Sequence, residues 1–355
     1  MARALVKEIK DTRKNYIING DMRISQRGTL FTSILSDRYS IDRMLYRKSG
    51  AMVHSIAQDT DVPTVAQAGY LFQNSLLSTV TTVDTSIAST DFCTLQHRVE
   101  GYNWANLAQR PCTLSFWVKS SQTGTYCVAL VNSAGDRSIV KEYTISAANT
   151  WEYKVLTFAA SPSSGTWNYT NGIGVSVCWT LAAGSNFQTT ADSWQTGNFI
   201  ATTNQVNATN TIVTEFRLTG LKLNEGSYAS PFSLFAGDAG GELAACQRYY
   251  EKSYNIDIFP GAASSNGQAI FNNNDSAGSR NPFFYIPFKV SKRTGVPAVT
   301  LYNPVTGATS SARGSDGGNY TIDSLQTGSN GLLARIVSLP AIVSGSVQFT
   351  AEAEL

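Results

Sequence analysis

Histidine, a frequent general base and metal ligand, occurs only twice in this sequence of 355 residues, as His54 and His97. Neither has ligand-like spacing to Cys, Asp or Glu, so no His-based triad and no zinc site is predicted. The sequence also lacks a P-loop, a GxSxG nucleophile motif and an HExxH motif. We therefore expect no metal and no cofactor. We expect both histidines to be surface side chains or side chains with satisfied hydrogen bonds.

Glycoside cleavage would need only two carboxylates, about 5 to 10 Å apart across a sugar cleft. The acidic residues of the first domain that could serve are Asp21, Asp37, Asp42, Asp91, Glu100, Asp192 and Glu215. Most stand in turns or at strand starts, where Asp commonly bonds the backbone, and nothing singles out a pair. The protein is predicted not to be an enzyme, and a glycan hydrolase or depolymerase is the catalytic alternative.

Sugar binding without cleavage needs an aromatic ring that stacks on the C–H face of the sugar, with polar groups nearby for its hydroxyls. Three polar loops offer both kinds of group: GYNWANLAQR, SSGTWNYTNG and TTADSWQTGN. The candidate glycan-binding residues in them are Trp104, Trp167, Asn168, Tyr169, Trp194 and Gln195. The alternative is that each tryptophan fills the core or plugs its loop, because aromatic side chains usually bury.

Composition limits the elements that can position such loops. Charged residues make up 15% of the chain, hydrophobic residues 42%, and the net charge is +2. A low charge with abundant Gly, Ser, Thr and Asn is typical of short strands joined by turns. The sequence has no dense block of basic residues, which would indicate a nucleic-acid partner. No apolar run reaches the roughly 18 residues of a membrane span. The N-terminus lacks an apolar signal-peptide core, so we expect folding in a cytoplasm.

The five cysteines are odd in number and widely spaced. No CxxC pair occurs among them, which gives no sign of a zinc ribbon or a redox dithiol. We expect free, structural thiols, with Cys112 and Cys178 acting as small core residues within apolar runs.

Alternation of apolar and polar residues predicts the strands. Residues 112–119, 151–155 and 173–179 alternate with the period of a half-buried strand. The phase of alternation switches between Leu218 and Leu221, and Gly220 at the switch predicts a β-bulge. Strands at this spacing with Gly-rich turns indicate an antiparallel sandwich.

The flexible stretch 237–241 marks a domain boundary. Beyond it we expect one helical turn over 242–246, a strand over 247–258, and then a smaller sandwich from strand-length segments between residues 283 and 353. Pro282 and Pro287 place the segment 283–290 at a sheet edge or in a bulge. The predicted fold is all-β, with two antiparallel jelly-roll-like sandwiches in tandem, residues 15–236 and 237–355.

Residues 1–14 form a short helical or extended arm in this prediction. Leu5 and Ile9 are four apart with Val6 beside them, which gives one apolar stripe. A piece this short is not stable alone in water. It is either a frayed terminus or a peg that docks on a larger assembly.

Several segments resemble one group of proteins. NYIINGDMRISQRG (15–28) followed by DRYSIDRMLY (37–46) is similar to the opening of tailed-bacteriophage tail fibre and tail-appendage proteins. LSFWVKSSQTGTY, NTWEYK and FRLTGLKLNEGSYASPF continue the likeness, which spans most of residues 15–235. ELAACQRYYEKSY (242–254) and the closing Ala353-Glu354-Leu355 are typical of the same group. Met22, Ile24 and Met44 stand where that group has aromatic residues, which weakens an inherited sugar-stacking role more than the fold.

The resemblance implies a carbohydrate-binding-module-like jelly roll, followed by a C-terminal β domain, in a virion structural protein made in the host cytoplasm. It implies a homotrimer that attaches to other virion proteins and contacts host-surface polysaccharide. A capsid or neck decoration (head-fibre) protein without a receptor role is the alternative. No nucleic-acid partner and no membrane insertion are expected.

Overall fold

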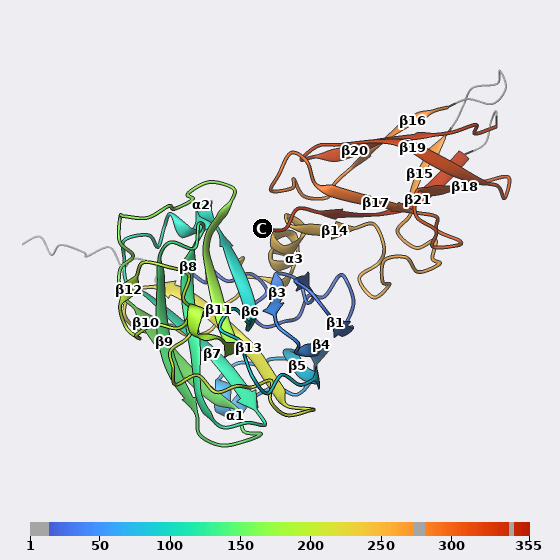
Figure 1. Ribbon diagram of the computed structural model, residues 1–355. Coiled ribbons are helices and arrows are strands. Elements are labelled where there is room, and N and C mark those ends of the chain that lie inside the picture. The colour runs from blue at the N-terminus through green and yellow to red at the C-terminus, as the bar shows by residue number, and fades with distance from the viewer. Residues whose placement is uncertain (1–13, 273–280, 341–343) are drawn as a thin grey trace, which may run out of the picture.

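The computed structural model describes residues 14–272, 281–340 and 344–355. In these ranges the regular secondary structure is almost all antiparallel β-sheet, with three short α-helices and one 3₁₀ turn (Figure 1). The predicted all-β, antiparallel fold class is confirmed. The arm residues Leu5, Val6 and Ile9 lie outside the described residues. In the part of the chain that the structure describes, no helix is long and apolar enough to cross a membrane.

Two sheets face each other in the larger part of the molecule. The six-stranded sheet has the order β1 (Leu30–Ile34), β4 (Val53–Asp59), β5 (Ser75–Thr82), β13 (Glu215–Glu225), β7 (Cys112–Ser120) and β10 (Glu152–Phe158). The seven-stranded sheet has the order β12 (Trp194–Gln195), β9 (Ser138–Ile145), β8 (Gly124–Asn132), β11 (Ile173–Ala183), β6 (Phe92–Glu100), β3 (Met44–Ser49) and β2 (Arg38–Tyr39).

The core between these sheets follows from the alternation of each strand. In β7 the side chains of Leu114, Phe116 and Val118 are fully buried, while Trp117 on the other face is half-buried. The Phe116 ring meets Trp179 of β11 edge to face, with ring centroids 5.9 Å apart. Because each large apolar side chain contributes roughly 1.5–3 kcal/mol when fully buried, this shared core holds the sandwich closed.

The predicted bulge at Gly220 is confirmed. The register of β13 against β7 shifts between Thr219 and Lys222, and Gly220 has φ +64°. A Cβ atom there would come within 2.7 Å of Phe72 and 3.1 Å of Trp117. Glycine is therefore required both by the backbone angle and by the two aromatic rings. Short helices α1 (Val65–Ala68) and α2 (Gly101–Trp104) and the 3₁₀ turn η1 (Ser185–Phe187) lie in the connections.

A third sheet follows helix α3 (Ala239–Gln247), which the Asp238 carboxylate caps by accepting from the Gly241 amide at 2.9 Å. Its strands run in the order β14 (Tyr250–Lys252), β21 (Ser344–Glu352), β18 (Ser311–Gly314), β19 (Asn319–Thr327), β20 (Gly331–Ile336) and β16 (Phe283–Pro287). Strands β15 (Ala269–Asn272) and β17 (Ala298–Tyr302) also pair with β21. The edge position of β16 agrees with the two prolines that bound it.

The predicted strand over 247–258 is wrong in extent. Helix α3 runs through Gln247, and only Tyr250–Lys252 pairs with β21. The alternation ends there because the Lys252 ammonium donates back to the carbonyls of Ile256 and Ile258, at 2.9 and 2.7 Å. These bonds hold the chain in a turn instead of an extended strand.

Candidate functional site

The tryptophans of the three predicted loops come together at one end of the sandwich. Trp104 stacks on Trp167 with centroids 5.7 Å apart and planes 18° apart. Trp167 meets Trp194 edge to face at 5.6 Å. Trp104 is buried, while Trp167 and Trp194 are half-buried and pack against the core.

The polar groups of this cluster mostly hold the loops themselves. The indole N–H of Trp167 donates to the Ser164 carbonyl, and that of Trp194 to the Ala159 carbonyl, both at 3.0 Å. The side-chain oxygen of Asn168 accepts hydrogen bonds from the backbone amides of Thr170 and Gly172. The side-chain amide of Gln195 donates to Ser193, and Tyr169 is exposed. The cluster thus closes the sandwich end, and Tyr169 is the most exposed of its predicted aromatic residues.

A cleft of about 340 Å³ lies on the outer face of the seven-stranded sheet. Its floor crosses β3, β6, β11 and β8, and the connection after β11 forms one wall. That connection is fastened by hydrogen bonds from Thr180 Oγ1 to the Ile200 carbonyl, 2.6 Å, and from Ser138 Oγ to the Gly197 carbonyl, 2.8 Å. The wall is therefore fixed in place before any ligand arrives.

The register of the strands lines up the side chains of the floor. Val131, Ser176 and Arg98 face each other across β8, β11 and β6, and Cys178 and Gln96 form the next row. Alternation turns all five away from the core, since their sequence neighbours, such as Val177, point inward.

Two phenylalanines give the cleft its apolar surface. Phe92 of β6 and Phe187 of η1 meet edge to face with centroids 5.0 Å apart, and the Arg47 guanidinium lies 5.6 Å from the Phe92 centroid. Ser176 and Asn198 line the same space, and neither side chain bonds to another described residue. Rings beside unengaged polar groups are what a sugar requires.

Among the described residues, no Asp or Glu lines this cleft. The predicted acidic candidates are engaged elsewhere: Asp21 with Arg23, Asp37 with Arg47, Asp42 with Gln26, Asp91 with Ser49, Glu100 with Arg248, Asp192 with Lys141 and Glu215 with Arg217. The described lining of the cleft lacks the pair of carboxylates that glycoside hydrolysis uses.

The histidines are not surface residues, contrary to one of the two alternatives expected. His54 and His97 are both buried, and each has one ring nitrogen bonded and one without a partner among the described residues. Burial lowers the pKa of His54 to about 3 and that of His97 well below its usual value. Both rings are therefore neutral, as a buried cation would be costly. No group of three His, Cys, Asp or Glu in the described ranges could hold a metal ion.

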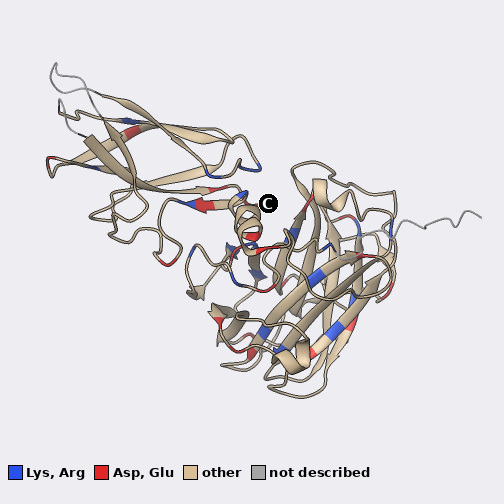
Figure 2. Ribbon diagram, turned by 180° about the vertical axis from the view of Figure 1, so that it is seen from behind, with Lys and Arg blue, Asp and Glu red and all other residues tan. Residues whose placement is uncertain are grey.

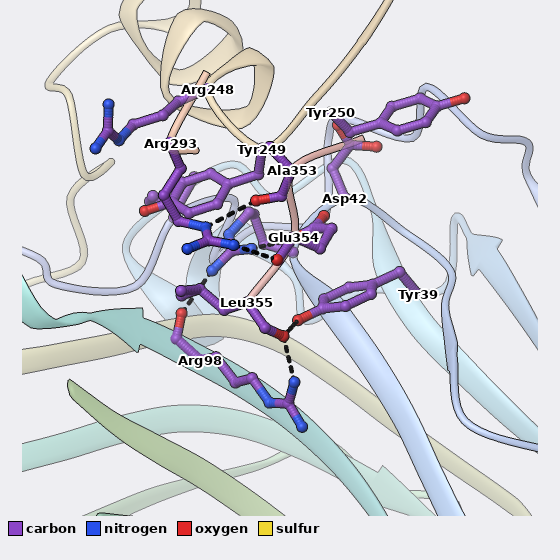
Figure 3. A network of polar contacts seen from close by, with 12 residues as sticks. Tyr39, Asp42, Arg98, Arg248, Tyr249, Tyr250, Arg293, Ala353, Glu354 and Leu355 are labelled. Atoms are coloured by element: carbon purple, nitrogen blue, oxygen red, sulfur yellow. Dashed lines mark hydrogen bonds and ion pairs between the residues drawn. The ribbon is translucent and has the colours of Figure 1, made fainter. Parts of the chain in front are cut away.

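Four of the segments that carry the phage resemblance, 15–28, 37–46, 242–254 and 353–355, meet in a buried polar junction between the sandwich and the third sheet (Figure 3). Arg43 forms an ion pair with Glu354, and its guanidinium lies 3.6 Å from the Tyr249 ring centroid. Arg27 pairs with the same carboxylate at 3.1 Å and lies 3.7 Å from the Tyr250 ring centroid. The Glu354 carboxylate is thus shared by two arginines, and Arg27 also has Glu352 and Asp42 within 4.0 Å.

The main chain is tied into the same junction. Arg293 donates to the carbonyls of Ala353 and Glu354 at 2.8 and 2.7 Å, and Tyr39 and Arg98 donate to the main-chain oxygen of Leu355. Figure 3 shows these residues converging from β2 (Tyr39), β6 (Arg98), the connection after β16 (Arg293) and the last residues of the chain. The bonds of Tyr39 and Arg98 join elements more than 250 residues apart in the sequence.

Buried carboxylates complete the junction. Arg248 and Tyr249 both donate to Glu100, the former through two bonds of 2.9 and 2.6 Å. Burial raises the pKa of Asp42 to about 6, against the opposing effect of Arg27. Figure 2 shows charged residues thinly spread over the rest of the sandwich, which makes this concentration stand out.

No protein-family model and no curated protein matches the chain. Among solved structures, similar folds include a CBM4 module, with 9% identity over 59% of this chain and 99% of that chain, TM-score 0.31. A family 11 carbohydrate-binding module from Clostridium thermocellum, in complex with a β-1,3-1,4-mixed-linked tetrasaccharide, has 11% identity over 56% and 97%, TM-score 0.31. TmCBM61, in complex with β-1,4-galactotriose, has 9% identity over 60% and 99%, TM-score 0.25. The neighbours are carbohydrate-binding modules of jelly-roll type, and a likeness this distant concerns the fold alone.

Sequence reasoning did not single out Phe92, Gln96, Ser176 or Phe187. Their residue types give no motif. The pairing of β6 with β11 brings Phe92, Gln96 and Ser176 to one face, and η1 adds Phe187. An available signal was the polar outward row of β6, Thr94, Gln96 and Arg98, beside Phe92.

Proposed function

We propose that this protein binds glycan in the cleft on the outer face of the seven-stranded sheet. The observation that carries the proposal is the pairing of Phe92 and Phe187 beside Ser176, Asn198 and Gln96 on a fixed, concave surface. A sugar ring would lie with its C–H face on a phenylalanine and its hydroxyls toward the polar groups. Because no carboxylate of the described residues lines the cleft, we propose binding without cleavage.

The test is binding of host-surface polysaccharides and an oligosaccharide array to the full chain and its variants. Phe92→Ala and Gln96→Ala should each weaken binding by about tenfold, which corresponds to about 1.4 kcal/mol. The matched control is Tyr102→Ala, which removes an aromatic ring that is 57% exposed and lies outside the cleft. Loss of binding in Trp167→Ala or Trp194→Ala, with full binding in Phe92→Ala, would move the site to the loop cluster.

We further propose that this glycan-binding body is part of a bacteriophage virion, as a trimeric tail fibre or appendage. The support is the sequence resemblance, which spans most of residues 15–235 and includes 242–254 and 353–355. Four of its segments, 15–28, 37–46, 242–254 and 353–355, contribute residues to the junction. Three weak glycan sites in one trimer would gain avidity without new contacts. Residues 1–14, with Leu5, Val6 and Ile9, would dock the protein on its virion partner.

Three measurements address the virion role. Labelled antibody on intact particles locates the protein on the tail, or on the neck or capsid in the decoration alternative. Deletion of residues 1–14 should abolish incorporation into particles, and normal incorporation contradicts the docking arm. Light scattering should give three times the 38.3 kDa chain mass. Release of reducing sugar from host polysaccharide would instead support a depolymerase.

A further inference from the structure

A second cleft, of about 310 Å³, lies on the opposite side of the sandwich, over the outer face of the six-stranded sheet. It is lined by β7, β10 and the bulge of β13, by the residues after α1, and by the segment 231–232. These strands belong to the sheet that does not carry the first cleft (Figure 1). None of the described residues that line it is charged.

Aromatic rings dominate this cleft. Trp117 and Tyr153 are direct cross-strand partners on β7 and β10, with ring centroids 5.3 Å apart and planes 41° apart. The Tyr153 side chain is 44% exposed. Opposite them, Tyr70, Phe72 and Phe232 pack together with all three centroid distances between 4.8 and 5.1 Å. The Trp117–Tyr153 pair and the Tyr70–Phe72–Phe232 group therefore line opposite sides of one space. Aromatic side chains are usually buried, so the exposure of Tyr153 is unusual.

The walls are held rigidly. The buried Lys222 ammonium donates to the Pro231 carbonyl and to Ser233, at 2.7 and 2.9 Å, and Asn15 donates to the Ser233 carbonyl at 3.0 Å. These bonds fasten the segment that carries Phe232. Gly220 lets Phe72 and Trp117 approach the bulge closely. A rigid site loses less entropy when a ligand binds.

Hydrogen-bonding groups stand at the rim. Tyr70 Oη accepts from Arg23 at 3.0 Å, which leaves its own hydrogen to donate outward. The Gln67 side-chain oxygen accepts from the Thr64 amide, while its NH₂ group donates to no described residue. Ser115 Oγ also lines the space without a bond to another described residue.

We propose that this aromatic cleft is a second glycan site, which binds the C–H face of a neutral pyranose between Trp117 and the Tyr70–Phe232 wall. Aromatic faces supply the stacking, and Gln67 and Tyr70 at the rim, with the buried Ser115 of β7 beneath them, supply hydrogen bonds to ring hydroxyls. The absence of charge from the described lining favours a neutral sugar over an acidic one. The site is separate from the cleft on the seven-stranded sheet, called here the sheet-face cleft, so either binding proposal can be refuted without the other.

The experiment uses the full chain with methyl β-D-galactopyranoside and methyl β-D-glucopyranoside, observed by saturation-transfer difference NMR. Galactoside protons H3, H4 and H5, which share one apolar face, should receive the most saturation. The saturation-transfer signal should persist in Phe92→Ala. In Trp117→Ala and Tyr153→Ala the affinity for the glycoside should fall by about tenfold. Tyr153→Phe keeps the ring and should bind normally. Melting curves establish that each variant is folded, and exposed Tyr153 gives the safer truncation.

Three results would overturn the proposal. The first is no saturation of either glycoside by the wild-type protein. The second is a signal lost in Phe92→Ala but retained in Tyr153→Ala, which would leave only the sheet-face cleft. The third is binding of a decaproline peptide, and of neither glycoside, lost in Tyr153→Ala, which would make the cleft a peptide groove.

Discussion

The substitution Glu354→Gln would remove a buried negative charge from between Arg27 and Arg43. The Glu354 side chain is 5% exposed, and the arginine side chains are 9% and 1% exposed. Burial alone lowers the pKa of Arg43, but Glu354 together with Tyr249, Tyr39 and Cys246 outweighs burial, and the pKa is raised overall. Glutamine keeps the size and one hydrogen-bonding oxygen, so the change tests charge and not packing.

The magnitude follows from what each arginine keeps. Leaving one partner of a buried ion pair uncompensated costs about 3–5 kcal/mol. Arg27 retains Glu352 at 3.5 Å and Asp42 at 4.0 Å, and Arg43 retains the face of the Tyr249 ring. We therefore expect the lower end, about 3 kcal/mol. At about 2–4 °C per kcal/mol, the Tm should fall by roughly 6–12 °C.

The assay is differential scanning calorimetry at neutral pH, with Asp323→Asn as the matched control. Asp323 pairs with Arg335 at 2.5 Å on the third sheet, but both side chains are about one third exposed, 35% and 36%. Solvent screens such a pair, so the control should melt with the wild-type protein. Equal melting of Glu354→Gln and Asp323→Asn would refute the reasoning that burial makes the junction charges count.

Three further outcomes are expected. The pKa of Asp42 is raised to about 6 from the ordinary value of 3.8, so the folded state binds the Asp42 proton more tightly than the unfolded state does. The contribution of Asp42 to the free energy of unfolding therefore falls by about 3 kcal/mol as the pH rises from about 4 to 6. Urea unfolding of Asp42→Asn should lack the fall that the wild-type protein shows. All five cysteines are free and buried, so a thiol reagent at pH 8 should react only after unfolding, and then with five; fast reaction of the native protein contradicts this. Gly220→Ala should cost about 1–3 kcal/mol, more than Gly69→Ala, which has a similar φ of +65° but open space around it; equal losses would exclude a contribution from the Phe72 contact.

Local pattern predicted much of the sandwich, because a strand half-buried in a core must alternate. It predicted β7, β10 and β11, and the bulge at Gly220, where the change of phase is visible in the sequence itself. It did not predict β6, whose inward positions include His97 among apolar residues. His97 interrupts the apolar pattern of the inward positions. It can be buried because it accepts a hydrogen bond from the Ile18 backbone amide, which lies 79 residues away in the sequence.

The clefts were beyond the reach of local pattern for a related reason. Each is assembled from four or more segments, and no segment alone contains both rings and polar groups in the arrangement that the cleft presents. The sequence did indicate loops that hold Trp104, Trp167 and Trp194, and the structure brings their rings together. It could not say how far each ring would be covered, because that depends on which loops lie above it.

The positions of Met22, Ile24 and Met44 change how the resemblance should be understood. All three are buried, two of them completely, so an aromatic residue at any of these positions would also be inside and unable to stack on a sugar. Their replacement therefore says nothing about glycan binding, contrary to the sequence expectation. In the same stretch, the side-chain NH₂ group of Asn19 donates to the carbonyls of Ile24 and Asp42. The backbone amide of Asn19 donates to the Glu242 carboxylate of α3. The opening motif and the ELAACQRYY segment are two halves of one structural joint. They specify how the third sheet is attached, while the surfaces that would meet a glycan are built from residues outside both.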